Sequence, residues 1–193
     1  MESGITVSSY RVLARRGFGC VYHQDMEIRP AEPEDALAVA RVHVRTWQVA
    51  YRGLLPDEYL DQLRAEDRAV RYQFRDLDPL RPWTIVADEA GVIRGFATTV
   101  PANQADLPDC GELAALHVDP DHWRRGIGAA LVSAARTRLR DLGFRKAMLW
   151  VLAGNVRADR FYRTDGWMPD GVSRIDTVWG AEVNELRYQR LLE

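Results

Sequence analysis

Apolar side chains recur every three or four positions along two long stretches of the chain, which is the spacing of one face of an α-helix. The first stretch spans residues 33–53 and places on that face Leu37, Ala40, Val44, Trp47 and Tyr51. The second stretch spans residues 126–142 and places on its face Ile127, Leu131, Ala135, Leu139 and Leu142. Residues 56–74 and 155–164 also have helical composition. We therefore expect four helical segments.

Short runs with strand-like composition separate these helices. Residues 83–89 and 92–100 flank the turn-forming sequence Glu89-Ala90-Gly91 and predict a hairpin. Further strands are expected at residues 26–31, 111–118, 146–152 and 182–192. This order is typical of one layered α+β domain, which we assign to residues 26–193. Residues 1–25 show no sustained period, so we treat them as an extension: an ordered accessory segment, a disordered arm or a start-site artefact.

Composition excludes several classes of protein. The chain has 193 residues, enough for a single core, with 47% apolar residues, 28% charged residues and a net charge of −2. The absence of a basic bias argues against a nucleic-acid partner. Cys20 and Cys110 lie far apart and match no metal or redox spacing, which favours reduced thiols. No apolar run has the length of a membrane span or a signal peptide, so we expect a cytoplasmic protein with no membrane partner.

The segment before the second long helix predicts an anion site. Arg124 and Arg125 precede Gly126-Ile127-Gly128, and glycines at a helix start let unpaired backbone amides approach an anion closely. A nucleotide P-loop would need Gly-Lys-Ser or Gly-Lys-Thr, which is missing. A dinucleotide-binding fingerprint would need glycine or alanine at Leu131. The pyrophosphate of an acyl-coenzyme A is the remaining candidate.

Two segments together resemble motifs A and B of the GNAT superfamily, the Gcn5-related N-acetyltransferases. LHVDPDHWRRGIGAALV matches the motif A pattern [Q/R]-x-x-G-x-[G/A] except at its first position, which is Trp123. NVRADRFYRTDGW matches motif B through Asn155, Ala158, Phe161, Tyr162, Gly166 and Trp167. The resemblance covers roughly residues 26–193. It implies a mixed, mostly antiparallel sheet flanked by helices, with acetyl-CoA as co-substrate and no metal.

The resemblance also implies which residues bind the coenzyme. In this family the strand before the loop separates from its neighbour, and its backbone pairs with pantetheine. The following helix start holds the pyrophosphate, mainly through backbone amides. Asn155 is expected to cap its helix and to bond to the pantetheine arm. The expected coenzyme-binding residues are Leu116, His117, Val118, Arg124, Arg125, Gly126, Ile127, Gly128, Ala129 and Asn155.

Two residues are candidates for proton transfer. By resemblance, Tyr162 lies near the coenzyme sulfur, where its hydroxyl can donate a proton to the departing thiolate. Glu112 lies eleven residues before Trp123, the offset of the general base in histone-acetylating members. In other members the base lies five residues before the motif B asparagine, but Trp150 occupies that position here. A solvent-exposed glutamate and a water chain to bulk solvent stay open as alternatives.

Other polar and aromatic residues are weaker candidates. Trp47 and Tyr51, one helical turn apart, either contact the acceptor or belong to the core. His117 and His122 have no apparent third ligand, so we expect surface or loop histidines and no metal site. Cys110 has no visible histidine partner, which argues against a nucleophile.

These observations predict an enzyme that transfers acetyl from acetyl-CoA to a primary amine by direct attack in a ternary complex. We expect a small-molecule acceptor, by analogy with single-domain relatives. A protein N-terminus or lysine is the alternative acceptor, and a non-catalytic acyl-CoA sensor is the alternative function. The sequence leaves the acceptor, the acyl-chain length and a homodimeric state open.

Overall fold

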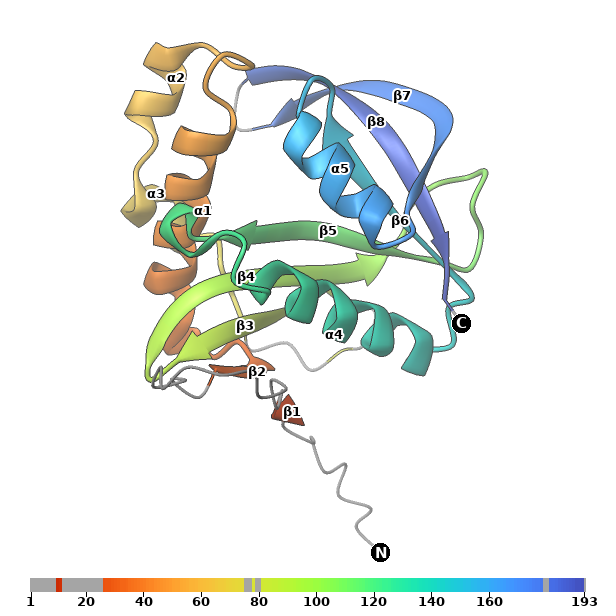
Figure 1. Cartoon of the computed structure of the whole chain (residues 1–193), viewed down its shortest axis with the longest axis horizontal. Coiled ribbons are helices and arrows are strands. Elements are labelled where there is room, and N and C mark those ends of the chain that lie inside the picture. The colour runs from red at the N-terminus through yellow and green to blue at the C-terminus, as the bar shows by residue number, and fades with distance from the viewer. Residues whose placement is uncertain (1–9, 12–25, 75–77, 79–80, 179–180, 193) are drawn as a thin grey trace, which may run out of the picture.

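The computed structural model describes residues 10–11, 26–74, 78, 81–178 and 181–192. Within these residues, eight strands form one sheet in the order β1-β2-β3-β4-β5-β6-β8-β7 (Figure 1). All neighbouring strands are antiparallel except β5 and β6, which run parallel. The prediction of a mixed, mostly antiparallel sheet flanked by helices is therefore confirmed.

The strands include every one predicted from the sequence, with small changes of boundary. Their bounds are β1 Tyr10–Arg11, β2 Met26–Pro30, β3 Trp83–Glu89, β4 Val92–Pro101, β5 Cys110–Val118, β6 Lys146–Leu152, β7 Met168–Val178 and β8 Ala181–Leu191. The sequence analysis missed β7. This strand has no regular apolar alternation, and its pairing with β8 shifts register between Pro169 and Ser173. Its place at the edge of the sheet removes the need for an apolar face.

The helices agree with the predictions except between residues 56 and 74. Their bounds are η1 Pro33–Asp35 and η2 Pro120–His122, which are 3-10 helices, and α1 Ala36–Ala50, α2 Asp57–Gln62, α3 Ala65–Ala69, α4 Ile127–Asp141 and α5 Val156–Thr164. The single helical segment expected at 56–74 is wrong. Leu63 and Arg64 adopt extended backbone angles, which end α2 before α3 begins.

Two layers of helices cover opposite faces of the sheet. Helices α4 and α5 pack on one face, nearest the viewer in Figure 1, over a core that includes Leu131, Leu139 and Trp167. Helix α1 packs on the other face, where Val39 and Phe96 are fully buried. Burial of these apolar side chains holds the sheet between the two helical layers.

The first 25 residues are described only at Tyr10–Arg11, which pair with β2 as a short edge strand. The remainder of the expected extension lies outside the described residues. None of the helices in the described part of the chain is long and apolar enough to cross a membrane.

Candidate active site

The centre of the candidate site is a gap in the sheet between β5 and β6. These strands pair only at Cys110↔Lys146, Gly111↔Ala147 and Glu112↔Met148. Beyond Glu112 they diverge, although β5 continues to Val118 and β6 to Leu152. The edge of each strand that faces the gap therefore presents backbone groups that an extended ligand could pair with.

Alternation along β5 decides which of these backbone groups face the gap. The Asp119 amide donates to Arg94 of β4 at 2.8 Å, so the amides of His117 and Asp119 are directed toward β4. The backbone amides of Leu116 and Val118 point to the open edge. The Val118 carbonyl already accepts hydrogen bonds from Trp123 Nε1 at 2.7 Å and Thr46 Oγ1 at 3.1 Å. The groups that remain for a ligand are the Leu116 amide and carbonyl and the Val118 amide.

The start of α4 lies beside this edge and has the geometry of an anion site. Gly126 is the N-cap with φ of 85°, and Arg124 before it also has a positive φ, 63°. The first helical hydrogen bond runs from the Ala130 amide to the Gly126 carbonyl at 3.0 Å. The amides of Ile127, Gly128 and Ala129 precede that bond, so they have no partner within the helix. Arg124 and Arg125 are exposed beside them.

Helix α5 begins close to the same gap and carries the proposed proton donor. Asn155 caps this helix, and its side-chain oxygen accepts from the Ala158 amide at 3.0 Å, as the sequence predicted. Tyr162 is buried, with 9% of its surface exposed. Its hydroxyl makes no hydrogen bond within the described part of the chain. Burial raises the pKa of Tyr162, and Tyr51 and Asp165 add to the effect, so the phenol stays protonated at neutral pH.

Glu112 sits at the point where β5 and β6 separate, because its pairing with Met148 is the last between them. Its side chain is partly buried. Burial raises the pKa of Glu112, and the nearby charge of Arg174 partly opposes this shift. A carboxylate of raised pKa at the edge of a gap is suited to accept a proton.

Trp47 and Tyr51 lie on the α1 side of the gap. Their rings make an edge-to-face contact with centroids 4.8 Å apart. Trp47 is 6% exposed and packs in an apolar cluster with Leu55 and Leu60. Burial raises the pKa of Tyr51 to about 12, and the charge of Glu185 contributes. Tyr51 also helps to raise the pKa of Tyr162, so the end of α1 lies near α5.

The expectation of surface histidines is wrong for His117. This residue is buried, and its ring stacks on that of His43 with centroids 4.3 Å apart. The reason is that α1 covers this face of β5. His122 ends the 3-10 helix η2, and its side chain is 13% exposed, so it is not a surface histidine either. Within the described residues, no three His, Cys, Asp or Glu side chains form a group that could hold a metal.

Sequence reasoning missed two features near the gap. Arg157 Cζ lies 3.2 Å from the centroid of the Trp123 ring, a contact between residues of different elements that no spacing could reveal. Trp150, in the part of β6 that no longer pairs with β5, has a buried Nε1 with no hydrogen-bond partner in the described structure. Arg174 stacks over its ring at 4.1 Å.

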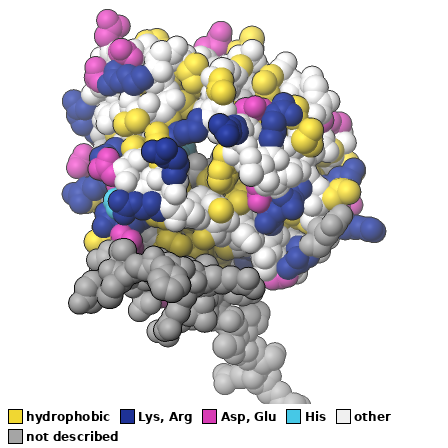
Figure 2. All heavy atoms as spheres, viewed as in Figure 1, with side chains coloured by type: hydrophobic (Ala, Val, Ile, Leu, Met, Phe, Trp, Pro, Cys, Tyr) yellow, Lys and Arg dark blue, Asp and Glu magenta, His cyan; other side chains and the backbone are white. Residues whose placement is uncertain are grey.

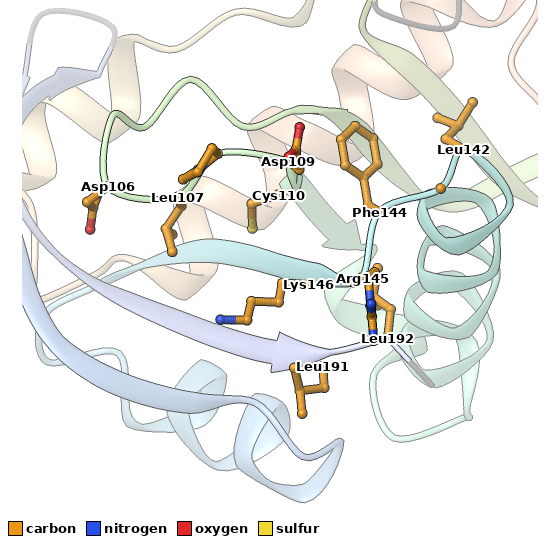
Figure 3. Close-up of a pocket in the computed structure, with 12 residues that line it drawn as sticks. Asp106, Leu107, Asp109, Cys110, Leu142, Phe144, Arg145, Lys146, Leu191 and Leu192 are labelled. Atoms are coloured by element: carbon orange, nitrogen blue, oxygen red, sulfur yellow. The ribbon is translucent and has the colours of Figure 1, made fainter.

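A separate hollow of about 800 Å³ lies at the opposite end of β5 and β6. Figure 3 shows Cys110, Phe144, Lys146 and Leu192 around it. It adjoins the C-terminal end of α4, away from the amides at the start of that helix. Burial raises the pKa of Cys110 to about 11, which disfavours the thiolate that a nucleophile requires.

Comparison with known proteins agrees with this geometry. The model of the acetyltransferase (GNAT) family matches residues 44–167. The uncharacterized N-acetyltransferase YuaI of Bacillus subtilis is 30% identical over 128 residues, 66% of this chain and 72% of that protein. A mycothiol acetyltransferase of Propionibacterium freudenreichii is 36% identical over 83 residues, 43% of this chain and 26% of that protein.

A solved structure shows the same fold. The PaiA N-acetyltransferase of Thermoplasma acidophilum, in complex with coenzyme A, aligns with a TM-score of 0.62 and 20% identity. The alignment covers 86% of this chain and 99% of that one. The family match over more than half of the chain shows that this protein belongs to the GNAT family of N-acetyltransferases.

Proposed function

We propose that this enzyme transfers the acetyl group of acetyl-CoA to a primary amine of a small molecule by direct attack in a ternary complex. One observation carries the proposal: β5 and β6 separate beyond Glu112, and the unpaired amides of α4 and the helix α5, which carries the buried Tyr162, follow these two strands. An extended thioester with an anionic end matches this arrangement.

The backbone would bind the coenzyme in two places. Leu116 and Val118 would pair with the pantetheine arm, as an added strand does. The amides of Ile127, Gly128 and Ala129 would hold the pyrophosphate at the positive end of the helix dipole. The side-chain nitrogen of Asn155 makes no hydrogen bond within the described residues, so it can donate to pantetheine while the oxygen caps α5.

The chemical step needs one base and one acid. The amine nitrogen attacks the thioester carbonyl carbon, and the carbonyl oxygen gains charge that a β5 amide can stabilise. Glu112 accepts the proton of the attacking amine, directly or through water. The carbon–sulfur bond then breaks, and Tyr162 donates its proton to the sulfur. The products are the acetylated amine and free coenzyme A.

Two observations favour a small acceptor near α1. Trp47 and Tyr51 form an aromatic wall on that side of the gap. The carboxylate of Glu112 at the gap lies near that of Glu185, which is paired with Arg174, so Glu112 would attract an ammonium group. The similarity to mycothiol acetyltransferase agrees with a small-molecule acceptor. A protein amine is the alternative within the same chemistry.

The test is thiol release from acetyl-CoA over a panel of polyamines, amino acids, aminoglycosides and peptides with a free N-terminus or lysine. We expect release with a small amine and an acetylated product of matching mass. Release only with peptides would assign a protein acceptor. Binding of acetyl-CoA without release for any acceptor in the panel would favour a sensor and contradict the proposal.

A further inference from the structure

The stacked pair formed by Trp123 and Arg157 lies beside the coenzyme gap and has no role in the mechanism above. Trp123 occupies the motif A position where the family pattern has glutamine or arginine. Its indole N–H is fixed on the Val118 carbonyl at 2.7 Å, so the ring has a defined orientation. Arg157 Cζ lies 3.2 Å from the ring centroid, which is close for a cation over an aromatic face.

The charge of Arg157 has no carboxylate partner among the residues that the structure describes. Partial burial lowers the pKa of Arg157, whereas Tyr51 alone opposes this effect. A cation taken partly out of water without an anionic partner is unfavourable, so the arrangement suits an anion that arrives with a ligand.

The position of Arg157 on α5 supports the same conclusion. It is the second residue of this helix, where the backbone dipole is already positive and a cation is disfavoured. Arg124 and Arg125 extend the positive charge at the start of α4. Basic side chains rim a hollow near the centre of the face that carries α4 and α5 (Figure 2). An anion between the two helix starts would interact favourably with all of these charges.

We propose that Arg157, oriented by the face of Trp123, binds the phosphate groups of acetyl-CoA and supplies from α5 the cationic side chain that motif A lacks at position 123. This inference rests on the proposed function, because it takes acetyl-CoA as the ligand. Trp123 acts as a positioning residue, because its ring covers one face of the planar guanidinium of Arg157. The N–H groups lie in the plane of the guanidinium and point outward, where they can bond to phosphate oxygens.

The experiment measures binding of two ligands by calorimetry to the full-length protein. Acetyl-CoA carries the phosphates, whereas S-acetylpantetheine has the same acyl arm without any phosphate. Arg157→Gln removes the charge from a residue at the surface of α5 whose guanidinium is covered only on the face that contacts Trp123, so the fold should be retained. Arg145→Gln, at the far end of α4, is the matched control because it causes the same change in net charge.

We expect Arg157→Gln to weaken acetyl-CoA binding by roughly ten- to a hundredfold, the usual effect of losing a charge-assisted hydrogen bond to phosphate. Binding of S-acetylpantetheine should change by less than about twofold, and Arg145→Gln should affect neither ligand. Adding Trp123→Arg to Arg157→Gln should recover much of the lost affinity. Trp123→Leu alone should weaken acetyl-CoA binding, because Arg157 loses the aromatic ring that orients its guanidinium.

Other outcomes would overturn the inference. Unchanged acetyl-CoA binding in Arg157→Gln would leave the pair a structural contact. Equal weakening of both ligands would move the contact to the pantetheine arm. If the wild-type protein binds neither ligand, the proposed function itself is wrong. That result differs from the outcomes above, in which the wild-type protein binds acetyl-CoA and only the role of Arg157 is wrong.

Discussion

Replacement of Tyr162 by phenylalanine separates the catalytic role of the hydroxyl from the structural role of the ring. The ring packs edge-to-face on Phe161 at 5.2 Å and on Trp167 at 6.2 Å, and these contacts survive in the variant. The hydroxyl makes no hydrogen bond within the described residues. Its removal should therefore change the free energy of unfolding by less than about 0.5 kcal/mol. The Tm should shift by less than about 2 °C.

The expected effect on catalysis is much larger. A positioned general acid contributes about 10²- to 10⁴-fold to the rate. We expect kcat to fall by about 10²- to 10³-fold, which corresponds to about 2.7 to 4.1 kcal/mol of transition-state stabilisation. An alkyl thiol has a pKa of about 8.5, so above that pH the departing sulfur is stable as a thiolate and depends less on a proton donor. The defect of Tyr162→Phe should therefore shrink at high pH.

The assay is initial-rate thiol release with saturating acetyl-CoA between pH 6 and 9.5, together with thermal unfolding. Tyr188→Phe is a matched control, because the hydroxyl of the buried Tyr188 donates to Asp159, a residue with no role in the proposed reaction. The control should lose about 1 to 2 kcal/mol of stability and keep its kcat. A Tyr162→Phe enzyme with normal kcat, or one that is destabilised as much as Tyr188→Phe, would refute the assignment.

Three further predictions concern the base, the loop and the buried histidines. Glu112→Gln should lower kcat/KM by about 10- to 100-fold at pH 7.5. In the wild type the rate should fall on acidification because Glu112 becomes protonated, and the variant should lose this fall. An unchanged pH–rate profile would favour a water chain. Gly126→Ala should cost about 1 kcal/mol of stability, because φ at this position is 85°, which side chains disfavour, although the added Cβ meets no other atom. The same variant should raise the KM for acetyl-CoA, and an unaltered KM would argue against amide contacts in this loop. Burial lowers the pKa of His43 and brings that of His117 to about 3, so the unfolded chain takes up protons first as the pH falls below about 6.5. The free energy of unfolding should fall by about 1.4 kcal/mol per histidine between pH 7.5 and 5.5, as measured by denaturant unfolding. In His117→Leu the fall over that range should be smaller than in the wild type.

The sequence predicted the parts of the fold that have strong periodicity or strong stop signals. The apolar stripes of α1 and α4 and the turn between β3 and β4 were all recognisable. Strand β7 was not, because an edge strand that pairs only with β8 needs no apolar face. The break between α2 and α3 depends on the backbone angles of Leu63 and Arg64, for which the sequence has no glycine or proline signal.

The candidate site was predictable where a motif fixes its residues. The loop before α4, the Asn155 cap and the position of Glu112 follow from local sequence. The burial of His117 does not, since it depends on which face of β5 is covered by α1. The pairing of Trp123 with Arg157 also escaped, because the two residues come from different elements and meet only across the gap between β5 and β6.

The central claim is that acetyl-CoA binds in the gap between β5 and β6, with its phosphates at the start of α4. The most direct test is a titration of acetyl-CoA followed by backbone amide chemical shifts. We predict the largest changes at residues 116–118, 126–129 and 155–158. Changes centred on Cys110, Phe144 and Lys146, around the hollow at the other end of the sheet, or no changes at all, would contradict the account.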